Sequence, residues 1–336
     1  MTRTGVELKP TWRTIPLAVR RAAEGQLGAP VQRAMRVWGG YTPTPTYRLR
    51  LADGRRAFFK AVGTDSNEFS RAAHQREERV YRELPELIFP WAPAFYGALR
   101  LDDWQVILLE DLGPKSAPPW SPALVRNVAR GFGQFHAATL GASLPAWLPR
   151  REQQFWSRSR LWTWLVESGD VQAIAELAGD QADSALSWLK EAAPVLADVS
   201  RRLADVGEPA AFLHRDVRSD NLRWVGGRLR LFDWPHVGVG PPEYDAAAFS
   251  QTVTVEGGPP PEVVLAAYAE GAPIRPAALD AAVAALAGFF ADQAWRDDVP
   301  GLPRLRGFQR QQLAVTLAWA SRRLRLPYPD WVGRLA

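Results

Sequence analysis

A polar loop between two short apolar runs constrains this chain more than any other feature. Residues 211–224 read AFLHRDVRSDNLRW, and after a Gly226-Gly227 turn the chain continues RLRLFDW. Ala211–Leu213 and Leu229–Phe232 have the composition of short strands, while long amphipathic segments on both sides predict helices. The sequence therefore predicts a mainly helical region that is interrupted by two short strands with a polar loop between them. We call this segment, residues 211–234, the polar island.

Three side chains of this island have the chemistry of phosphoryl transfer. Asp216, Asn221 and Asp233 follow one another at intervals of five and twelve residues. A carboxylate in a loop accepts a proton from a hydroxyl, and amide and carboxylate oxygens are ligands that magnesium prefers. Phosphoryl transfer needs a positioned acceptor and neutralised phosphate charge, with little covalent chemistry from the protein. The spacing therefore indicates a metal-assisted phosphoryl transfer site.

The first third of the chain predicts an antiparallel sheet with one inserted helix. Alternation of apolar and basic residues over 47–51, followed by Asp53-Gly54, is typical of a hairpin, because glycine supplies the positive φ of a tight turn. Residues 94–100 and 104–109 predict a second strand pair. Between the pairs, 68–84 has helical spacing. Its expected apolar side carries Phe69, Ala73, Val80, Tyr81 and Leu84.

The remainder of the chain predicts a larger helical part after a Pro- and Ser-rich connector at 115–122. The fold class that follows is α+β, with a small antiparallel β-rich lobe over 1–110 and a larger, mainly α-helical lobe over 111–336. The expected helices are 122–139, 151–168, 170–206, 262–271, 276–294 and 305–325.

Composition removes several classes of function. The chain of 336 residues has no cysteine, which excludes disulfides, thiol nucleophiles and Cys-ligated metals, and its four histidines are not spaced as a zinc helix requires. The net charge of +5 comes from short, scattered basic clusters, which favours solvated faces over a nucleic-acid surface. No signal-peptide pattern begins the sequence, and the apolar stretch 281–291 is too short to span a bilayer. We therefore expect a cytoplasmic protein without membrane or nucleic-acid partners.

The polar island resembles the catalytic loop of the protein-kinase-like superfamily, and more closely that of the aminoglycoside phosphotransferase and choline kinase family. His214-Arg215-Asp216 and Asn221 match the H-R-D-x-x-x-x-N loop, and Asp233-Trp234 stands where a protein kinase has Asp-Phe-Gly. Asp245 follows in a Gly-Pro-Pro-Glu-Tyr-Asp stretch like that family's G-x-P-x-x-D, without an A-P-E motif. The resemblance covers residues 30–250 and implies a two-lobed kinase-like fold.

The resemblance also implies a role for each matching residue. Asp216 would be the catalytic base, and Asn221 and Asp233 would hold Mg²⁺. Lys60 would bind the nucleotide phosphates and pair with Glu77, which is preferred over its neighbour Glu78. Glu110 and Leu112 would belong to the hinge that receives the base, with Gly39 and Gly40 over the phosphates. His214 and Asp245 would support the catalytic loop, and Arg218, Trp234 and His236 are candidates for substrate or phosphate contact.

Two departures from the family pattern bear on this interpretation. The phosphate-covering loop contains Pro43 and Pro45 instead of a G-x-G-x-x-G, which removes backbone donors. The catalytic loop carries Arg218 and Asp220 where the family commonly has other residues, and the C-terminal part shows no acidic bias for a polycationic antibiotic.

The predicted function is therefore an ATP- or GTP-dependent small-molecule kinase that phosphorylates a hydroxyl-bearing substrate as a monomer or weak dimer. A catalytically silent nucleotide-binding protein on the same fold is the main alternative. A protein kinase is disfavoured, because the twelve residues from Asp233 to Asp245 leave no room for an activation segment. A nucleic-acid-binding protein rests only on the isoelectric point of about 9.7.

Overall fold

The computed structural model describes residues 9–38, 44–150, 155 and 157–335. Its contacts divide the chain into two compact units, each described here by itself. The smaller unit comprises 1–115, 220–236 and 300–303, and the larger unit comprises 116–219, 237–299 and 304–336. The division at residue 110, with a role for each lobe, stays a prediction.

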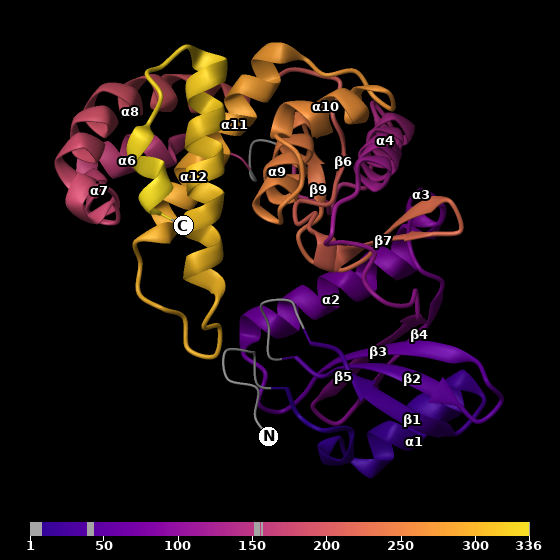
Figure 1. Ribbon diagram of the computed structural model, residues 1–336. Coiled ribbons are helices and arrows are strands. Elements are labelled where there is room, and N and C mark those ends of the chain that lie inside the picture. The colour runs from indigo at the N-terminus through magenta and orange to yellow at the C-terminus, as the bar shows by residue number, and fades with distance from the viewer. Residues whose placement is uncertain (1–8, 39–43, 151–154, 156, 336) are drawn as a thin grey trace. The chain divides into compact units, whose positions relative to one another are not determined.

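A five-stranded antiparallel sheet forms the centre of the smaller unit (Figure 1). Both predicted hairpins are present, and the strand order is β1-β2-β3-β5-β4. The turn at Asp53-Gly54 has the expected positive φ at its glycine, +87° at Gly54. The Asp53 carboxylate accepts the Arg55 N–H at 3.0 Å. The strands are β1 (Val31–Arg36), β2 (Thr46–Leu51), β3 (Arg56–Val62), β4 (Phe95–Leu101) and β5 (Trp104–Glu110).

One face of this sheet carries the core of the smaller unit. Tyr47, Leu49 and Leu51 alternate inward from β2, and Trp12 packs edge-on against Tyr47 and Phe59. Helix α1 (Leu17–Leu27) contacts β4 and β5 and buries only three side chains, spaced four residues apart. An apolar stripe this narrow does not predict a helix from the sequence. The structure therefore has α1 in addition to the helix predicted over 68–84.

Asn67 is the N-cap of helix α2 (Glu68–Glu83), and its side chain accepts the Ser70 N–H at 2.8 Å. The predicted apolar side is wrong at Phe69, which is 69% exposed. His74, Glu77 and Glu78 are buried instead. Carboxylates are rarely buried unless they are paired, and both glutamates have basic partners. Helix α3 (Pro85–Ile88) follows directly.

The larger unit is mainly helical (Figure 1). The predicted helices at 122–139 and 276–294 have the expected bounds, whereas 170–206 is broken into two helices. Helix α9 was not predicted, because it is buried on almost every side and lacks an amphipathic period. The helices are α4 (Pro122–Thr139), α6 (Leu161–Ser168), α7 (Val171–Glu176), α8 (Ala182–Asp205), α9 (Pro242–Val255), α10 (Pro261–Ala269), α11 (Pro276–Ala294) and α12 (Leu305–Leu324).

Among the described residues, α11 is the one helix long and apolar enough to cross a membrane by length and composition. Inside the structure 72% of its apolar window is buried, as in the core helix of a globular unit.

The polar island is divided between two small antiparallel pairs. In the larger unit β6 (Ala211–Leu213) pairs with β9 (Gly238–Gly240), and the segment that carries Asp216 follows β6. In the smaller unit β7 (Leu222–Val225) pairs with β8 (Arg228–Leu231). This second pair places Asn221 just before β7 and Asp233 just after β8.

Candidate functional site

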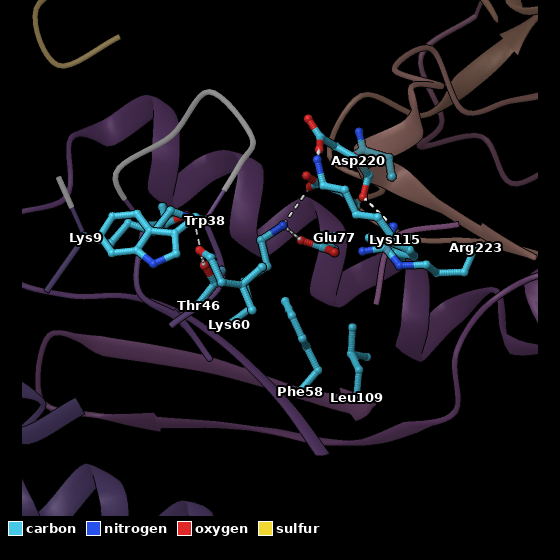
Figure 2. A pocket seen from close by; sticks show the side chains of 15 residues that line it. Lys9, Trp38, Thr46, Phe58, Lys60, Glu77, Leu109, Lys115, Asp220 and Arg223 are labelled. Carbon is cyan, nitrogen blue, oxygen red and sulfur yellow. Dashed lines mark hydrogen bonds and ion pairs between the residues drawn. The ribbon is translucent and has the colours of Figure 1, made fainter. Parts of the chain in front are cut away.

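Lys60 is the centre of a charged cluster in the smaller unit. It lies on β3 opposite Thr46 of β2 and Ile107 of β5. Its Nζ donates to Glu77 Oε2 at 2.5 Å and to Asp233 Oδ1 at 2.6 Å. Figure 2 shows the Lys60 side chain reaching the Glu77 carboxylate across the pocket. One ammonium group thus joins strand β3, helix α2 and Asp233, the second residue after β8.

Burial and charge act against each other on this cluster. Burial alone would lower the pKa of Lys60, but the Asp233 and Glu77 carboxylates outweigh it and raise that pKa above its usual value. Burial raises the pKa of Glu77 to about 6, although Lys60 opposes the change. With Lys60 protonated and both acids ionised, the cluster carries one net negative charge. A divalent cation bound beside the carboxylates would offset this negative charge.

His74 lies on α2, one helical turn before Glu77, and is 3% exposed. Neither of its ring nitrogens has a hydrogen-bond partner. Burial, reinforced by the Lys60 charge, lowers the pKa of His74 to about 3. The imidazole is therefore neutral at physiological pH and packs as a core side chain.

Asn221 and Asp233 line the same pocket as Lys60. The backbone carbonyl of Asn221 accepts the Phe232 N–H at 3.0 Å, which ties the start of β7 to the residue before Asp233. Asp233 is held at φ +67°, a left-handed conformation that is costly for a residue other than glycine and concentrates at functional sites. One amide and one carboxylate oxygen in one pocket are a donor set that fits Mg²⁺.

The pocket continues into an apolar slot in the smaller unit. Val37, Phe58, Leu109 and Phe232 line both the charged pocket and the slot. The predicted hinge residues Glu110 and Leu112 line the slot as well. Glu110 is fixed to the neighbouring chain, since its N–H donates to the Ala94 carbonyl at 2.8 Å and its carboxylate accepts the Ala94 N–H at 3.1 Å.

Sequence reasoning missed the basic side chains around this slot and the charged pocket. Arg223 of β7 lines both the slot and the charged pocket. Arg48 donates from Nε to the Asp111 carboxylate in the slot. Lys115 pairs with Asp220 at the pocket wall (Figure 2). In the sequence, Arg48 is one of the polar residues that alternate with apolar residues along a predicted strand. That pattern is typical of an arginine that faces solvent.

Asp216 belongs to the larger unit, and Arg218 lies directly on it. The Arg218 guanidinium donates from Nε to Asp216 Oδ1 at 2.9 Å and from Nη2 to Oδ2 at 3.1 Å. The Asp216 side chain is 28% exposed. A two-pronged, charge-assisted contact of this kind fixes the orientation of a carboxylate. Arg218 was a candidate for substrate contact, and the structure places it on the candidate base.

Asp245 of α9 is fully buried beneath the loop that carries Asp216. Its carboxylate accepts the backbone N–H of His214 at 2.7 Å and that of Arg215 at 3.0 Å. His136 of α4 reaches Asp245 with Nε2 at 3.4 Å, and its Nδ1 lies 2.6 Å from the Tyr268 hydroxyl. This buried network anchors the backbone just before Asp216, where Arg215 has φ +65°.

The other candidates lie as follows. His214 is buried, and its Nδ1 accepts the Asp216 N–H at 3.3 Å. Trp234 is 0% exposed, so its side chain packs in the core and presents no surface for the suggested substrate contact. His236 is half-buried, with its ring centroid 6.5 Å from that of Phe69. Gly39 and Gly40 lie outside the described residues.

Comparison with known proteins agrees with this geometry. The model of the phosphotransferase enzyme family matches residues 33–286, which is most of the chain. The chain belongs to the phosphotransferase enzyme family. No curated protein matches the chain significantly.

Solved structures similar to this phosphotransferase-family chain show the kinase-like fold. An aminoglycoside phosphotransferase from Alicyclobacillus acidocaldarius is 16% identical with a TM-score of 0.55, covering 88% of this chain and 93% of its own. A spectinomycin phosphotransferase solved with ADP and spectinomycin is 12% identical with a TM-score of 0.58, covering 95% and 96%. Choline kinase LicA from Streptococcus pneumoniae is 14% identical with a TM-score of 0.51, covering 88% and 98%. The predicted fold class, an antiparallel β-rich part and a larger helical part, is confirmed.

Proposed function

We propose that this chain is a nucleoside-triphosphate-dependent small-molecule kinase that transfers a γ-phosphoryl group to a substrate hydroxyl. The observation that carries the proposal is Lys60, bonded to Glu77 and Asp233 in the pocket that Asn221 also lines. Family membership supports the same chemistry.

Each charged residue then has a definite task. Lys60 binds the nucleotide phosphates, and Glu77 holds its ammonium group in place. Asn221 and Asp233 would hold Mg²⁺, which would neutralise phosphate charge. Asp216 accepts the proton of the acceptor hydroxyl while that oxygen forms a bond to the γ-phosphorus. The bond from the γ-phosphorus to the bridging oxygen breaks, and the nucleoside diphosphate leaves.

The decisive experiment measures magnesium-dependent release of ADP or GDP over a panel of hydroxyl compounds that includes aminoglycosides, sugars and amino alcohols. Asp216→Asn is compared with wild type and with Asp198→Asn, which removes an exposed carboxylate paired with Arg201 and Arg202. We expect one compound class to stimulate release, Asp216→Asn to abolish the stimulation and Asp198→Asn to retain it. Nucleotide binding without turnover on any compound would favour the catalytically silent alternative.

A further inference from the structure

Helix α9 is connected at both of its ends to the loop that carries Asp216. Near its N-terminal end, the buried Asp245 carboxylate accepts the backbone N–H groups of the two residues before Asp216. At its C-terminal end, Glu256 Oε1 accepts the Ser219 hydroxyl at 2.7 Å. The two contacts lie on opposite sides of Asp216 along the chain, so one helix holds the loop both before and after the candidate base.

The backbone of Glu256 is fixed by the way in which α9 ends. Glu256 is the C-cap, and the next residue, Gly257, has φ +82°. The Gly257 N–H donates to the Thr254 carbonyl at 3.1 Å, and the Gly258 N–H donates to the Val253 carbonyl at 2.8 Å. These two bonds form the Schellman motif, which commonly ends a helix at a glycine. A Cβ at Gly258 would lie 2.5 Å from Val253 Cγ1, so this end of the helix is also closely packed.

The Glu256 carboxylate joins two donors that come from different parts of the larger unit. Its Oε2 accepts the Trp120 Nε1–H at 2.9 Å, while its Oε1 accepts the Ser219 hydroxyl. Trp120 is buried and packs edge-on against Phe249 of α9, with the ring centroids 6.0 Å apart. An ionised carboxylate only accepts hydrogen bonds and has two oxygens, so it can bond both donors at once. The indole therefore restrains the carboxylate that holds Ser219.

Ser219 lies close along the chain to the candidate base and to a candidate metal ligand. It follows Asp216 by three residues, and it begins the 3₁₀ turn Ser219–Asn221. Ser219 is 2% exposed, so its bond to Glu256 is shielded from bulk water. A hydrogen bond to an ionised group in such a place is stronger than one between neutral groups. A restraint on Ser219 therefore limits the motion of the loop segment 217–219.

We propose that Glu256 is a positioning residue for phosphoryl transfer and that it acts on Asp216 through Ser219. Asp245 fixes the loop before the candidate base, and Glu256 fixes it after that base. The assignment rests on the proposed kinase function and adds to it a residue of the larger unit that lies outside the sequence motifs. Loss of Glu256 should therefore lower kcat and leave the affinity for nucleotide unchanged.

The first test measures kcat and the nucleotide Kd of Glu256→Ala, with the acceptor that stimulates the wild-type chain. We expect kcat to fall about tenfold, the loss of one charge-assisted hydrogen bond, while the Kd stays within about twofold of wild type. Glu270→Ala is the matched control and should keep the wild-type kcat, because Glu270 is likewise the C-cap of its helix, α10, and its carboxylate pairs with Arg126. A wild-type kcat in Glu256→Ala, or an equal loss in Glu270→Ala, would overturn the role of Glu256.

The second test asks whether the bond to Ser219 carries the effect. Glutamine has an acceptor oxygen for the Trp120 indole and an amino group that can donate to the Ser219 oxygen, so Glu256→Gln should recover most of the lost kcat. Ser219→Ala should lose as much kcat as Glu256→Ala, and the double variant should lose no more than either single variant. Additive losses in the double variant, or a Glu256→Gln variant as slow as Glu256→Ala, would overturn the action through Ser219.

Amide hydrogen exchange gives a readout that does not depend on turnover. Peptides that include 217–219 should exchange faster in Glu256→Ala than in wild type or Glu270→Ala, while peptides from the middle of α9 should be unchanged. Faster exchange throughout α9 would mean that the helix itself has opened, and it would overturn the local role.

The same readout separates the two proposals. If no compound stimulates turnover of the wild-type chain, the proposed kinase function fails, and exchange over 217–219 alone decides whether Glu256 holds the loop. Unchanged exchange there in Glu256→Ala would overturn the positioning role, whatever the outcome for the kinase.

Discussion

The candidate site residues are held in different ways in the two units. In the smaller unit, Lys60, Glu77 and Asp233 hold one another through side-chain charges that come from three separate elements. In the larger unit, Asp216 lies on a loop whose backbone is fixed by the buried carboxylate of Asp245. The first arrangement is held by side-chain charges that face a pocket, whereas the second holds the candidate base through its backbone.

This difference tells which substitutions should change binding and which should change turnover. A charge removed from the cluster alters the field that phosphate and metal meet and leaves a buried partner without compensation. A change at Asp245 should move Asp216 without touching the proposed nucleotide pocket of the smaller unit. The comparison therefore predicts separable defects in affinity and in kcat.

Among the residues of the charged cluster, the largest effect is expected for Asp233→Asn. Asparagine tolerates the left-handed backbone at this position, so the variant removes charge without adding backbone strain. We expect kcat to fall by about a thousandfold, or about 4 kcal/mol, with loss of magnesium-dependent nucleotide affinity. Metal titrations of nucleotide binding measure the effect.

Asp102→Asn is its matched control, because Asp102 also has a positive φ but sits in an exposed turn between β4 and β5. An unchanged magnesium requirement in Asp233→Asn would remove Asp233 from the metal site.

A smaller, turnover-specific effect is expected for Asp245→Asn. The amide has one acceptor oxygen for the two backbone N–H groups of His214 and Arg215, so one of them loses its partner. We expect kcat to fall by about a hundredfold, or about 2.7 kcal/mol, while the nucleotide Kd stays within twofold of wild type. Steady-state kinetics and titration of the same preparation separate the two quantities. Equal losses in Kd and kcat would contradict the separation of the two units' roles.

How much the sequence could predict follows the same division. Asn221 and Asp233 were predicted from their spacing in the polar island, and Lys60 and Glu77 from the resemblance to the kinase-like family. The structure places all four around one pocket, whereas Gly39 and Gly40 lie outside the described residues.

Other features needed the tertiary structure. Arg223 lies on a short strand where an arginine gives no sign of burial, and α9 is buried on nearly all sides, which erases its helical period. Phe69 was predicted on the wrong face of α2. Hydrophobic periodicity does not account for ion pairs, and ion pairs allow Glu77 and Glu78 to be buried on that helix.

Acid should destabilise the smaller unit through His74, independently of catalysis. Its pKa is about 3 in the folded chain and near 6.5 when unfolded, so below pH 6.5 the unfolded chain binds the extra proton. The His74 contribution to stability should therefore fall as pH falls from 6.5 towards 3, by about 1.4 kcal/mol per pH unit, and the raised pKa of Glu77 opposes part of this loss below about pH 6. Denaturant unfolding of wild type and His74→Leu at pH 7 and pH 5 measures this, with the half-buried His236→Gln as control. A wild-type pH dependence that persists in His74→Leu would assign it to other groups.

The smallest effect on kcat is expected for a change at Arg218. This change tests whether a side-chain charge positions Asp216 in the larger unit, as side-chain charges hold the cluster of the smaller unit. Arg218→Gln removes the two-pronged contact with Asp216 and leaves the loop backbone bonded to Asp245. We expect kcat to fall about fivefold, or about 1 kcal/mol, with the nucleotide Kd unchanged. Arg218→Lys keeps the charge but not the planar fork, and it should recover only part of the loss. Arg201→Gln, which breaks an exposed pair with Asp198, should have no effect on kcat. A rise in kcat in Arg218→Gln would instead mean that the guanidinium competes with the acceptor hydroxyl for Asp216, and that the charge contact restrains this base instead of positioning it.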